Sequence, residues 1–216
     1  MILPSTSLPL FAAPEELAPG LILHRSWFDP AAQLALVNEL RGVIQQAPLF
    51  TPAMPKTGTP FSVRMTNCGT LGWVSDITGY RYQPQHPGTG GPWPEIPPSL
   101  LAVWEALSGF AAPPEACLVN WYEGKAKMGL HQDKDEQAFE APVLSVSLGD
   151  TCLFRYGGLK RNDPTRSVKL SSGDVLLIGG ASRLCFHGVD RVLGGSSDLL
   201  PRGGRINLTL RRVSRV

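Results

Sequence analysis

Several common signatures of enzyme active sites are missing from this chain of 216 residues. It contains no G-x-x-x-x-G-K-[ST] phosphate loop, no G-x-G-x-x-G dinucleotide fingerprint and no G-x-S-x-G nucleophile elbow. Phosphate-loop, dinucleotide-binding and serine-hydrolase functions therefore lack support. The four cysteines include no C-x-x-C pair. This spacing argues against a disulfide framework or a zinc clip, and it predicts free thiols in a reducing compartment.

Long apolar segments are also missing. The first twenty residues contain several prolines and lack a basic start, so neither a signal peptide nor a membrane span is predicted. We therefore expect a cytoplasmic protein with no membrane partner. Residues 1–20 are predicted to be a flexible arm, and residues 21–216 are long enough for a single domain.

Glycine and proline are abundant, at 23 and 20 residues, and they favour short strands and turns over a helical bundle. One helix is predicted from the N-cap Asp29 and Pro30 to about Gln46, and a second from Pro98 to Phe110. Short apolar segments separated by turn residues predict strands at 21–23, 61–66, 117–122, 143–148, 152–156, 167–170, 174–178, 184–187 and 205–211. The fold class is therefore mainly β with flanking helices (α+β), built as a sandwich or barrel.

The formal net charge of +2 is unevenly distributed. Residues 1–154 carry 8 Lys and Arg against 14 Asp and Glu, whereas residues 155–216 carry 12 Lys and Arg against 4 Asp and Glu. A basic C-terminal third suits a polyanion such as nucleic acid. Charge alone favours the simpler interpretation, in which these residues are solvated strand and loop charges.

His131, Asp133 and His187 are candidate metal ligands. In an extended chain, His131 and Asp133 point to the same face because they are two residues apart. His187 follows the apolar residues 184–186 and precedes a glycine, as expected for the end of a strand at the mouth of a barrel. Two imidazoles and a carboxylate can hold one face of Fe(II) and leave three positions open. Zinc accepts the same ligands, so this pattern alone leaves the metal undecided.

The segment 205–211, RINLTLR, separates these options. Its polar and apolar residues alternate, so as a strand it would place Arg205 and Arg211 on one face. Arginine grips carboxylates bidentately and keeps its charge, which suits a small dicarboxylate. A zinc hydrolase needs no such pair, whereas an iron oxygenase that consumes 2-oxoglutarate does. The alternative is an exposed strand face with surface charges.

Six segments share the order and spacing of a known family from about residue 60 to the end. They are MTNCGTLGW at 65–73, N-x-Y at 120–122, HQDKDE at 131–136, LKRNDP at 159–164, SRLCFHG at 182–188 and RINLTLR at 205–211. Together they resemble the AlkB family of nucleic-acid dealkylases. The resemblance implies a double-stranded β-helix (jelly-roll) core at about 115–216 and a nucleotide-recognition lid at about 47–98. It also implies Fe(II), 2-oxoglutarate as co-substrate and O2.

The resemblance assigns a role to each matching residue. The implied metal ligands, which form the catalytic centre, are His131, Asp133 and His187. The implied 2-oxoglutarate contacts are Asn120, Tyr122, Arg205, Asn207 and Arg211. Arg205, supported by Tyr122, would pair with the distal carboxylate. Arg211 and Asn120 would serve the end that chelates the metal.

The candidate substrate contacts are Met65, Trp73, Tyr80, Arg81, Tyr82, Asp135 and Arg161. Substrates of the family include 1-methyladenine and 3-methylcytosine, which alkylation makes cationic. A cation on an aromatic face gains about 0.5–2 kcal/mol, so Trp73 is expected to stack on the base, with Asp135 accepting from its exocyclic amine and His131 on the other side.

Other roles are open for several of these residues. Trp73 and Met65 could be ordinary core residues. The aromatic and cationic group at 80–82 suits phosphate and sugar contacts. Arg161 suits the base or a phosphate, or else it belongs to a plain turn with exposed charges.

The expected function is oxidative demethylation of N-alkylated bases in DNA, single-stranded or flipped out of a duplex, with RNA as a further candidate. Decarboxylation of 2-oxoglutarate would be coupled to methyl hydroxylation and formaldehyde release by a monomer. One alternative is a 2-oxoglutarate oxygenase acting on a protein or a small metabolite, which would not need Trp73 or Asp135. The other is a non-catalytic nucleic-acid-binding jelly roll, which would bind no iron.

Overall fold

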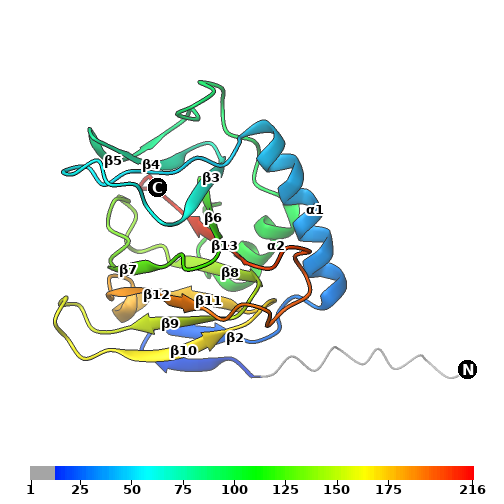
Figure 1. Ribbon diagram of the computed structural model, residues 1–216. Helices are drawn as coiled ribbons and strands as arrows, with labels where there is room; N and C mark the ends of the chain where they lie inside the picture. The colour runs from blue at the N-terminus through cyan, green and yellow to red at the C-terminus, as the bar shows by residue number, and fades with distance from the viewer. Residues whose placement is uncertain (1–12) are drawn as a thin grey trace, which may run out of the picture.

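The computed structural model describes residues 13–216, which form two main β-sheets, a separate hairpin and two α-helices (Figure 1). The larger sheet contains, in spatial order, β1 (Glu15–Ala18), β2 (Leu21–His24), β11 (Val175–Ile178), β8 (Val143–Gly149), β13 (Arg205–Arg211), β6 (Ala116–Tyr122) and β3 (Arg64–Gly69). The smaller sheet contains β10 (Arg166–Leu170), β9 (Cys152–Tyr156), β12 (His187–Val192) and β7 (Met128–His131). Strands β4 (Gly72–Asp76) and β5 (Gly79–Gln83) form the hairpin. The sequence prediction of a mainly β fold with flanking helices and a jelly-roll core is confirmed.

Helices α1 (Pro30–Gln46) and α2 (Pro98–Leu107) lie on the same side of the larger sheet (Figure 1). Asp29 begins α1, because its carboxylate accepts a hydrogen bond from the backbone N–H of Ala32 at 2.8 Å. The buried stripe of α1 consists of Leu36, Val37, Leu40 and Val43. The predicted bounds of this helix are confirmed. Within residues 13–216, no helix is long and apolar enough to cross a membrane.

Strands β8 and β13 are buried on both faces because the larger sheet lies between the helices and the smaller sheet. In β13, Ile206, Leu208 and Leu210 share one apolar core with α1 and α2. The alternate residues of the same strand line a cavity between the two sheets. The alternative of an exposed strand face is therefore wrong, since Arg205 and Arg211 are only 1% and 6% exposed.

The N-terminal arm was predicted too long. Residues 1–12 lie outside the described part of the chain, but β1 at Glu15–Ala18 pairs with β2, which in turn pairs with β11. The core therefore extends beyond 115–216, and it also includes β3 from the region predicted as the lid, because β3 pairs with β6. Both segments supply edge strands of the larger sheet. The partner of β3 lies about fifty residues away in the sequence, too far for a local pattern to reveal it, whereas β1 pairs with the adjacent β2 and is only four residues long.

The strand predicted at 184–187 is displaced, and His187 begins β12 instead of ending a strand. A 3₁₀ turn at Gly180–Ser182 precedes it, and the N–H groups of Cys185 and Phe186 donate to Ser182 and to Gly158. These hydrogen bonds place residues 184–186 in a loop. Sequence analysis also missed β1, β4, β5 and β7, and it placed β3 three residues too early.

Candidate active site

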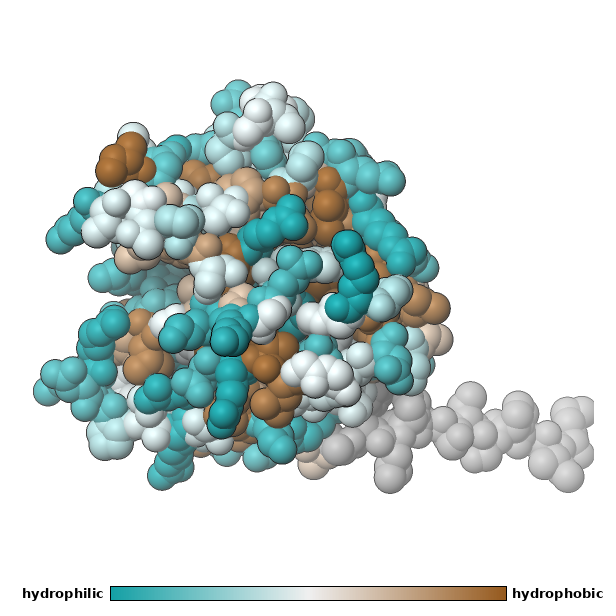
Figure 2. All heavy atoms as spheres, in the orientation of Figure 1, coloured by the Kyte–Doolittle hydropathy of each residue, from teal (hydrophilic) through white to brown (hydrophobic). Residues whose placement is uncertain are grey.

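A cavity of about 520 Å³ opens between the two sheets and the β4–β5 hairpin. Thirteen of the fifteen residues named from the sequence line it: Met65, Trp73, Tyr80, Asn120, Tyr122, His131, Asp133, Asp135, Arg161, His187, Arg205, Asn207 and Arg211. Figure 2 shows the outer face in this region, which is hollowed at the left between the hairpin and the strands below. Arg81 and Tyr82 do not line the cavity.

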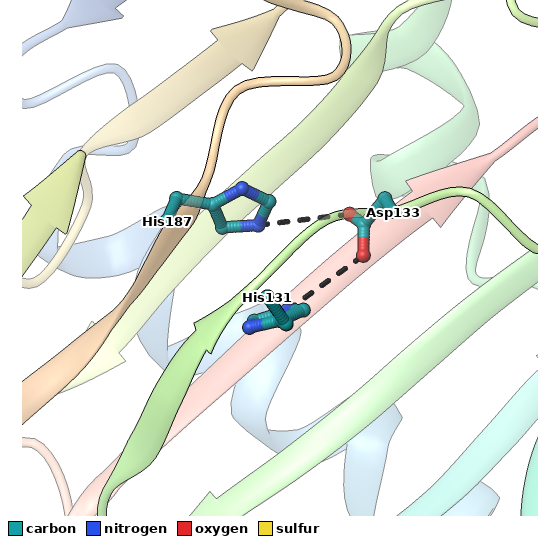
Figure 3. Close-up of side chains that lie close together, drawn as sticks. All are labelled: His131, Asp133 and His187. Carbon is teal, nitrogen blue, oxygen red and sulfur yellow. Dashed lines mark ion pairs between the residues drawn. The ribbon is translucent and has the colours of Figure 1, made fainter. Parts of the chain in front are cut away.

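The three candidate metal ligands converge, as Figure 3 shows. His131 ends β7, Asp133 lies in the loop that follows, and His187 begins β12, where it is the register partner of His131. Nε2 of His131 lies 3.7 Å from Asp133 Oδ1, and Nε2 of His187 lies 3.8 Å from Asp133 Oδ2. One ligand atom from each residue lies within 4.8 Å of the others. Strand pairing thus closes the long gap in sequence between Asp133 and His187.

Backbone contacts orient both imidazole rings toward this centre. His131 Nδ1 lies 2.9 Å from the carbonyl oxygen of Gly129, and His187 Nδ1 lies 3.1 Å from that of Cys185. A carbonyl oxygen can only accept, so each Nδ1 carries the proton and each Nε2 presents a lone pair toward Asp133. Asp133 Oδ2 is buried and receives no hydrogen bond from any residue of the described range 13–216. This set of donors fits a divalent metal ion.

The electrostatics of the site also favour metal-binding protonation states. Burial, together with the neighbouring His131, lowers the pKa of His187 to about 4, so the ring is neutral near pH 7. Burial alone would raise the pKa of Asp133, but Arg211 and the two imidazoles outweigh burial and hold that pKa below its usual range. A neutral imidazole and an ionised carboxylate are the forms that ligate a metal.

Arg205 is a buried cation without an anionic partner among residues 13–216. Its Nη2 donates to Ser147 Oγ at 2.8 Å, whereas Nε and Nη1 have no hydrogen-bond partner in the part of the chain that the structure describes. Burial raises the pKa of neighbouring Tyr122, despite the charge of Arg205, and keeps the phenol neutral as a donor. An unpaired buried charge is costly, which is why such groups are normally paired. This arrangement fits a carboxylate ligand that completes the site.

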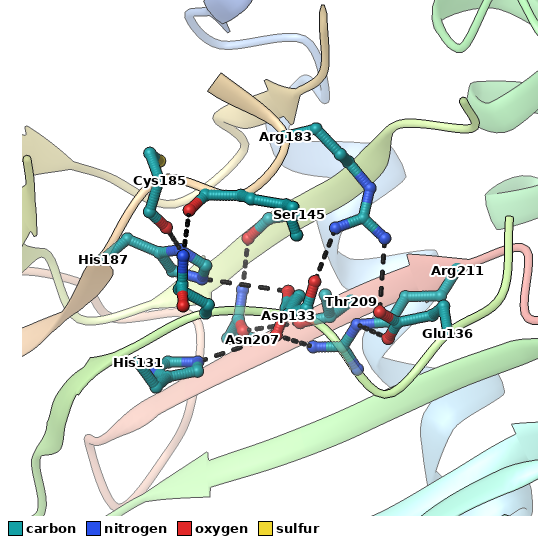
Figure 4. Close-up of polar contacts among 12 residues, drawn as sticks. His131, Asp133, Glu136, Ser145, Arg183, Cys185, His187, Asn207, Thr209 and Arg211 are labelled. Carbon is teal, nitrogen blue, oxygen red and sulfur yellow. Dashed lines mark hydrogen bonds and ion pairs between the residues drawn. The ribbon is translucent and has the colours of Figure 1, made fainter. Parts of the chain in front are cut away.

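Arg211 belongs to a different electrostatic environment, shown in Figure 4. Its Nη2 donates to Asp133 Oδ1 at 3.0 Å, and its Nε forms an ion pair with Glu136 Oε1 at 3.3 Å, without hydrogen-bond geometry. Glu136 also accepts from Arg183 Nη2 at 3.2 Å, and Arg183 Nη1 donates to the carbonyl oxygen of Asp133. Two buried guanidiniums therefore hold the segment 133–136 in place.

Sequence analysis missed Glu136 and Arg183, although both lie inside motifs that it used. Glu136 is the last residue of HQDKDE, and Arg183 is the second residue of SRLCFHG, directly after the 3₁₀ turn. For Arg183 the available signal was a charged residue directly before the apolar residues 184–186, whereas the wholly polar segment 131–136 gave no such signal for Glu136. Three arginines of the basic C-terminal third are buried, namely Arg183, Arg205 and Arg211. The surface of this third therefore carries three fewer positive charges than its sequence suggests.

The wall facing the metal ligands is aromatic and acidic. The Trp73 ring stacks on Tyr80 with a centroid distance of 5.6 Å and an interplanar angle of 19°. Trp73 Nε1 donates to Asp135 Oδ2 at 2.8 Å, so this carboxylate lies at the edge of the stacked pair. Met65 is fully buried in the cavity lining, on strand β3.

Arg81, Tyr82 and Arg161, which were also predicted to contact the substrate, have intramolecular partners. Arg81 forms an ion pair with Asp76 at 2.8 Å, and Tyr82 donates to Glu136 at 2.5 Å. Arg161 lines the cavity, and its Nη1 donates to the carbonyl oxygen of Leu130. Arg81 holds the turn of the hairpin and Tyr82 ties β5 to Glu136, and a contact of either side chain with a bound substrate stays a prediction.

Comparison with known proteins agrees with this geometry. Residues 20–211 match the 2OG-Fe(II) oxygenase superfamily. An alpha-ketoglutarate-dependent dioxygenase AlkB homolog of Caulobacter vibrioides is 53% identical over 95% of this chain and 93% of its own length, and AlkB of Escherichia coli is 42% identical over 93% and 94%. The DNA N(6)-methyladenine demethylase ALKBH1C of Arabidopsis thaliana is 31% identical over 90% of this chain and 48% of its own length. The solved structure of OsALKBH1 matches with a TM-score of 0.78 and 31% identity, over 93% of this chain and 100% of that chain. The chain therefore belongs to the AlkB family of Fe(II)- and 2-oxoglutarate-dependent dioxygenases.

Proposed function

We propose that this enzyme removes N-linked alkyl groups, of the 1-methyladenine and 3-methylcytosine type, from bases in DNA, with RNA as a second nucleic-acid substrate. One observation carries the proposal. A single cavity joins a metal-binding triad and an unpaired buried arginine, on one side, to an aromatic and acidic wall on the other. The name of the plant relative supports a nucleic-acid substrate.

In this proposal His131, Asp133 and His187 hold Fe(II). When bound, the metal, 2-oxoglutarate and O2 supply the oxidising chemistry that hydroxylates the N-methyl group, with succinate, carbon dioxide and formaldehyde as products. The protein positions these reactants. The carbonyl oxygens of Gly129 and Cys185 orient the two rings, and Arg211 fixes the carboxylate of Asp133.

We assign the 2-oxoglutarate contacts as follows. Arg205 binds the distal carboxylate, assisted by the neutral phenol of Tyr122. Arg211 and Asn120 act at the end that chelates the metal, since Arg211 already contacts Asp133. Asn207 donates to Ser145 Oγ at 2.7 Å, which holds its amide beside these groups.

The substrate base is proposed to stack on Trp73, with His131 on its other face and Met65 in the lining. Asp135 accepts from the exocyclic amine, at the edge of the tryptophan ring that it already contacts. A cationic base gains about 0.5–2 kcal/mol from the aromatic face, and it is also attracted by the carboxylate. A neutral undamaged base loses both electrostatic contributions, so the charge of the lesion is itself the basis of selectivity. A base inside a duplex must first be flipped out, at a cost of a few kcal/mol.

We further propose that residues 47–98, apart from β3, act as the nucleotide-recognition lid, and that the enzyme works as a monomer. The hairpin of this segment contributes Trp73 and Tyr80 to the cavity wall. The residues proposed to hold the metal, 2-oxoglutarate and the base all line one cavity of a single chain.

The test is to load the protein with Fe(II) and 2-oxoglutarate without oxygen, and then to admit air together with an oligonucleotide containing 1-methyladenine. Formaldehyde should appear in proportion to the methylated base, and the unmethylated oligonucleotide is the control. If methylated oligonucleotides do not stimulate succinate release, while a protein or metabolite does, the substrate assignment is wrong. If the protein binds no iron and His131→Ala leaves DNA affinity unchanged, the domain is a non-catalytic binding module.

A further inference from the structure

A second cavity, of about 250 Å³, lies on the helical side of the larger sheet. Leu40 and Ile44 of helix α1 form one wall, and residues 200–203, in the loop that leads into β13, form another. This loop passes beside α1 in Figure 1. Trp121 of β6 and Ile206 of β13 also line the cavity, which the sheet therefore separates from the active site.

The second cavity lies directly behind the proposed 2-oxoglutarate site. Trp121 and Ile206 are register partners, and the pairs on either side of them carry the proposed 2-oxoglutarate contacts. Successive residues of a strand face opposite sides of the sheet. The two cavities therefore share strands β6 and β13 but no lining residue.

The polar groups of the second cavity are all hydrogen-bond donors from side chains, and two of them are cations. Arg202 makes no hydrogen bond or ion pair with any residue of the described chain, and Arg41 donates only to the neutral amide oxygen of Asn38, at 2.9 Å. The Trp121 Nε1 atom is buried and has no acceptor within residues 13–216. No acidic residue of the described range lines the cavity. A buried indole N–H without an acceptor is uncommon, since buried polar groups are normally satisfied.

The loop wall is held in place without a ligand. The N–H of Gly203 donates to the carbonyl oxygen of Leu200 at 2.8 Å, and the N–H of Gly204 donates to Asp150 Oδ2 at 2.8 Å. Gly203 and Gly204 take φ values of +68° and +93°, which favour glycine and let the loop turn back toward α1. A preformed cavity loses little conformational entropy when it binds a ligand.

We propose that the second cavity binds a small monocarboxylate with an apolar body. A carboxylate oxygen can accept from the indole N–H of Trp121, and the charge is balanced by Arg41 and Arg202, since arginine binds carboxylates in bidentate geometry. The apolar body then packs on the aliphatic lining. The volume lies below the range of about 300–1,000 Å³ that drug-sized ligands occupy, so the ligand is small.

The two cavities should prefer different anions. A dicarboxylate such as 2-oxoglutarate would bury its second charge against the aliphatic walls formed by Leu40, Ile44 and Ile206, which is costly without a partner. A monocarboxylate avoids this cost. The inference does not depend on the substrate of the enzyme, because none of these residues belongs to the proposed active site.

The test uses octanoate as the probe and the full chain loaded with Zn(II) and saturating 2-oxoglutarate, which occupy the first cavity. The NMR signal of the Trp121 indole N–H, identified by its loss in Trp121→Phe, should shift saturably as octanoate is added. Octanol has the same chain length without the charge and should bind at least about tenfold more weakly, because hydrogen bonds to charged groups are the stronger ones.

Substitutions separate the contribution of charge from that of shape. The double variant Arg41→Gln/Arg202→Gln should raise the Kd for octanoate at least about tenfold. Ile44→Trp, which fills the cavity from α1 and keeps both arginines, should abolish the shift. The matched control is Arg191→Gln, an exposed arginine on β12, which should leave the Kd unchanged.

Three results would each overturn the proposal: no saturable shift of the Trp121 signal, equal affinity for octanol, or an unchanged Kd in the double arginine variant. A shift that occurs only when 2-oxoglutarate is absent would mean that octanoate enters the first cavity, and the proposal would again be wrong. Failure of the demethylation assay would refute the proposed function alone, because none of these measurements involves turnover.

Discussion

Replacing Arg205 by methionine separates the function of this residue from its effect on stability. The guanidinium is 1% exposed, it keeps a single hydrogen bond, to Ser147, and it has no carboxylate partner in the described part of the chain. Replacing buried charged groups by apolar residues of similar volume is often neutral or stabilising by about 1–4 kcal/mol. The ligand-free Arg205→Met variant should therefore unfold at the same temperature as the wild type or higher.

The stabilisation that 2-oxoglutarate gives on binding should, in contrast, be smaller in Arg205→Met than in the wild type. At a ligand concentration of 100 Kd the wild type gains about 2.7 kcal/mol, which raises Tm by roughly 5–11 °C for a domain of this size. Removing one partner of a buried charge pair costs about 2–5 kcal/mol of binding, or an increase in Kd of at least about 30-fold. At the same ligand concentration the variant then gains less than about 1 kcal/mol.

The assay is calorimetric unfolding of the Mn(II)-loaded protein with and without 2-oxoglutarate, because Mn(II) occupies such sites without turnover. Arg191→Met is the matched control, since Arg191 is an exposed arginine on strand β12, and this variant should keep the full ligand-induced shift. If Arg205→Met keeps that shift, Arg205 does not bind the dicarboxylate. If the ligand-free variant is destabilised by more than about 1 kcal/mol, the argument from an unpaired buried charge is wrong.

The remaining predictions concern the metal, the substrate wall and the hairpin. Asp133→Ala should abolish Fe(II) binding and turnover together, measured by equilibrium dialysis and formaldehyde release, and retention of stoichiometric iron would contradict its role as a ligand. Trp73→Ala should raise KM for the methylated oligonucleotide about tenfold or more while sparing Fe(II) affinity, whereas equal loss of both would identify a structural tryptophan. Hydrogen bonds from Arg81 and Thr78 hold the pKa of Asp76 below its usual range, so the Asp76 carboxyl should titrate below free aspartate by NMR and the midpoint should rise in Arg81→Gln. An unchanged midpoint would mean that the pair does not persist in solution.

Local sequence patterns predicted the elements whose formation depends on neighbouring residues. The cap at Asp29 and the apolar stripe behind it predicted α1, because helix hydrogen bonds and caps join residues three or four positions apart. The alternation in 205–211 predicted β13 with its bounds, since successive residues of a strand face opposite sides. Strands β4, β5 and β7 were missed because they have only four or five residues each, and β7 in addition pairs with the distant β12 in an irregular register.

Sequence by itself determined which chemistry this protein could host: two imidazoles, a carboxylate near one of them, and two arginines on one strand face. Tertiary structure alone decided which of these charged side chains are buried and which of them are paired. The pairing of β12 with β7 set His187 opposite His131, and the covering helices turned the arginine face inward. Arg205 is left without a carboxylate partner among residues 13–216, whereas Arg211 binds Asp133. The same applies to Arg81 and Tyr82, whose side chains found partners within the protein. The physical reason is that burial and ion pairing depend on contacts between segments far apart in the chain, which no local pattern of residues encodes.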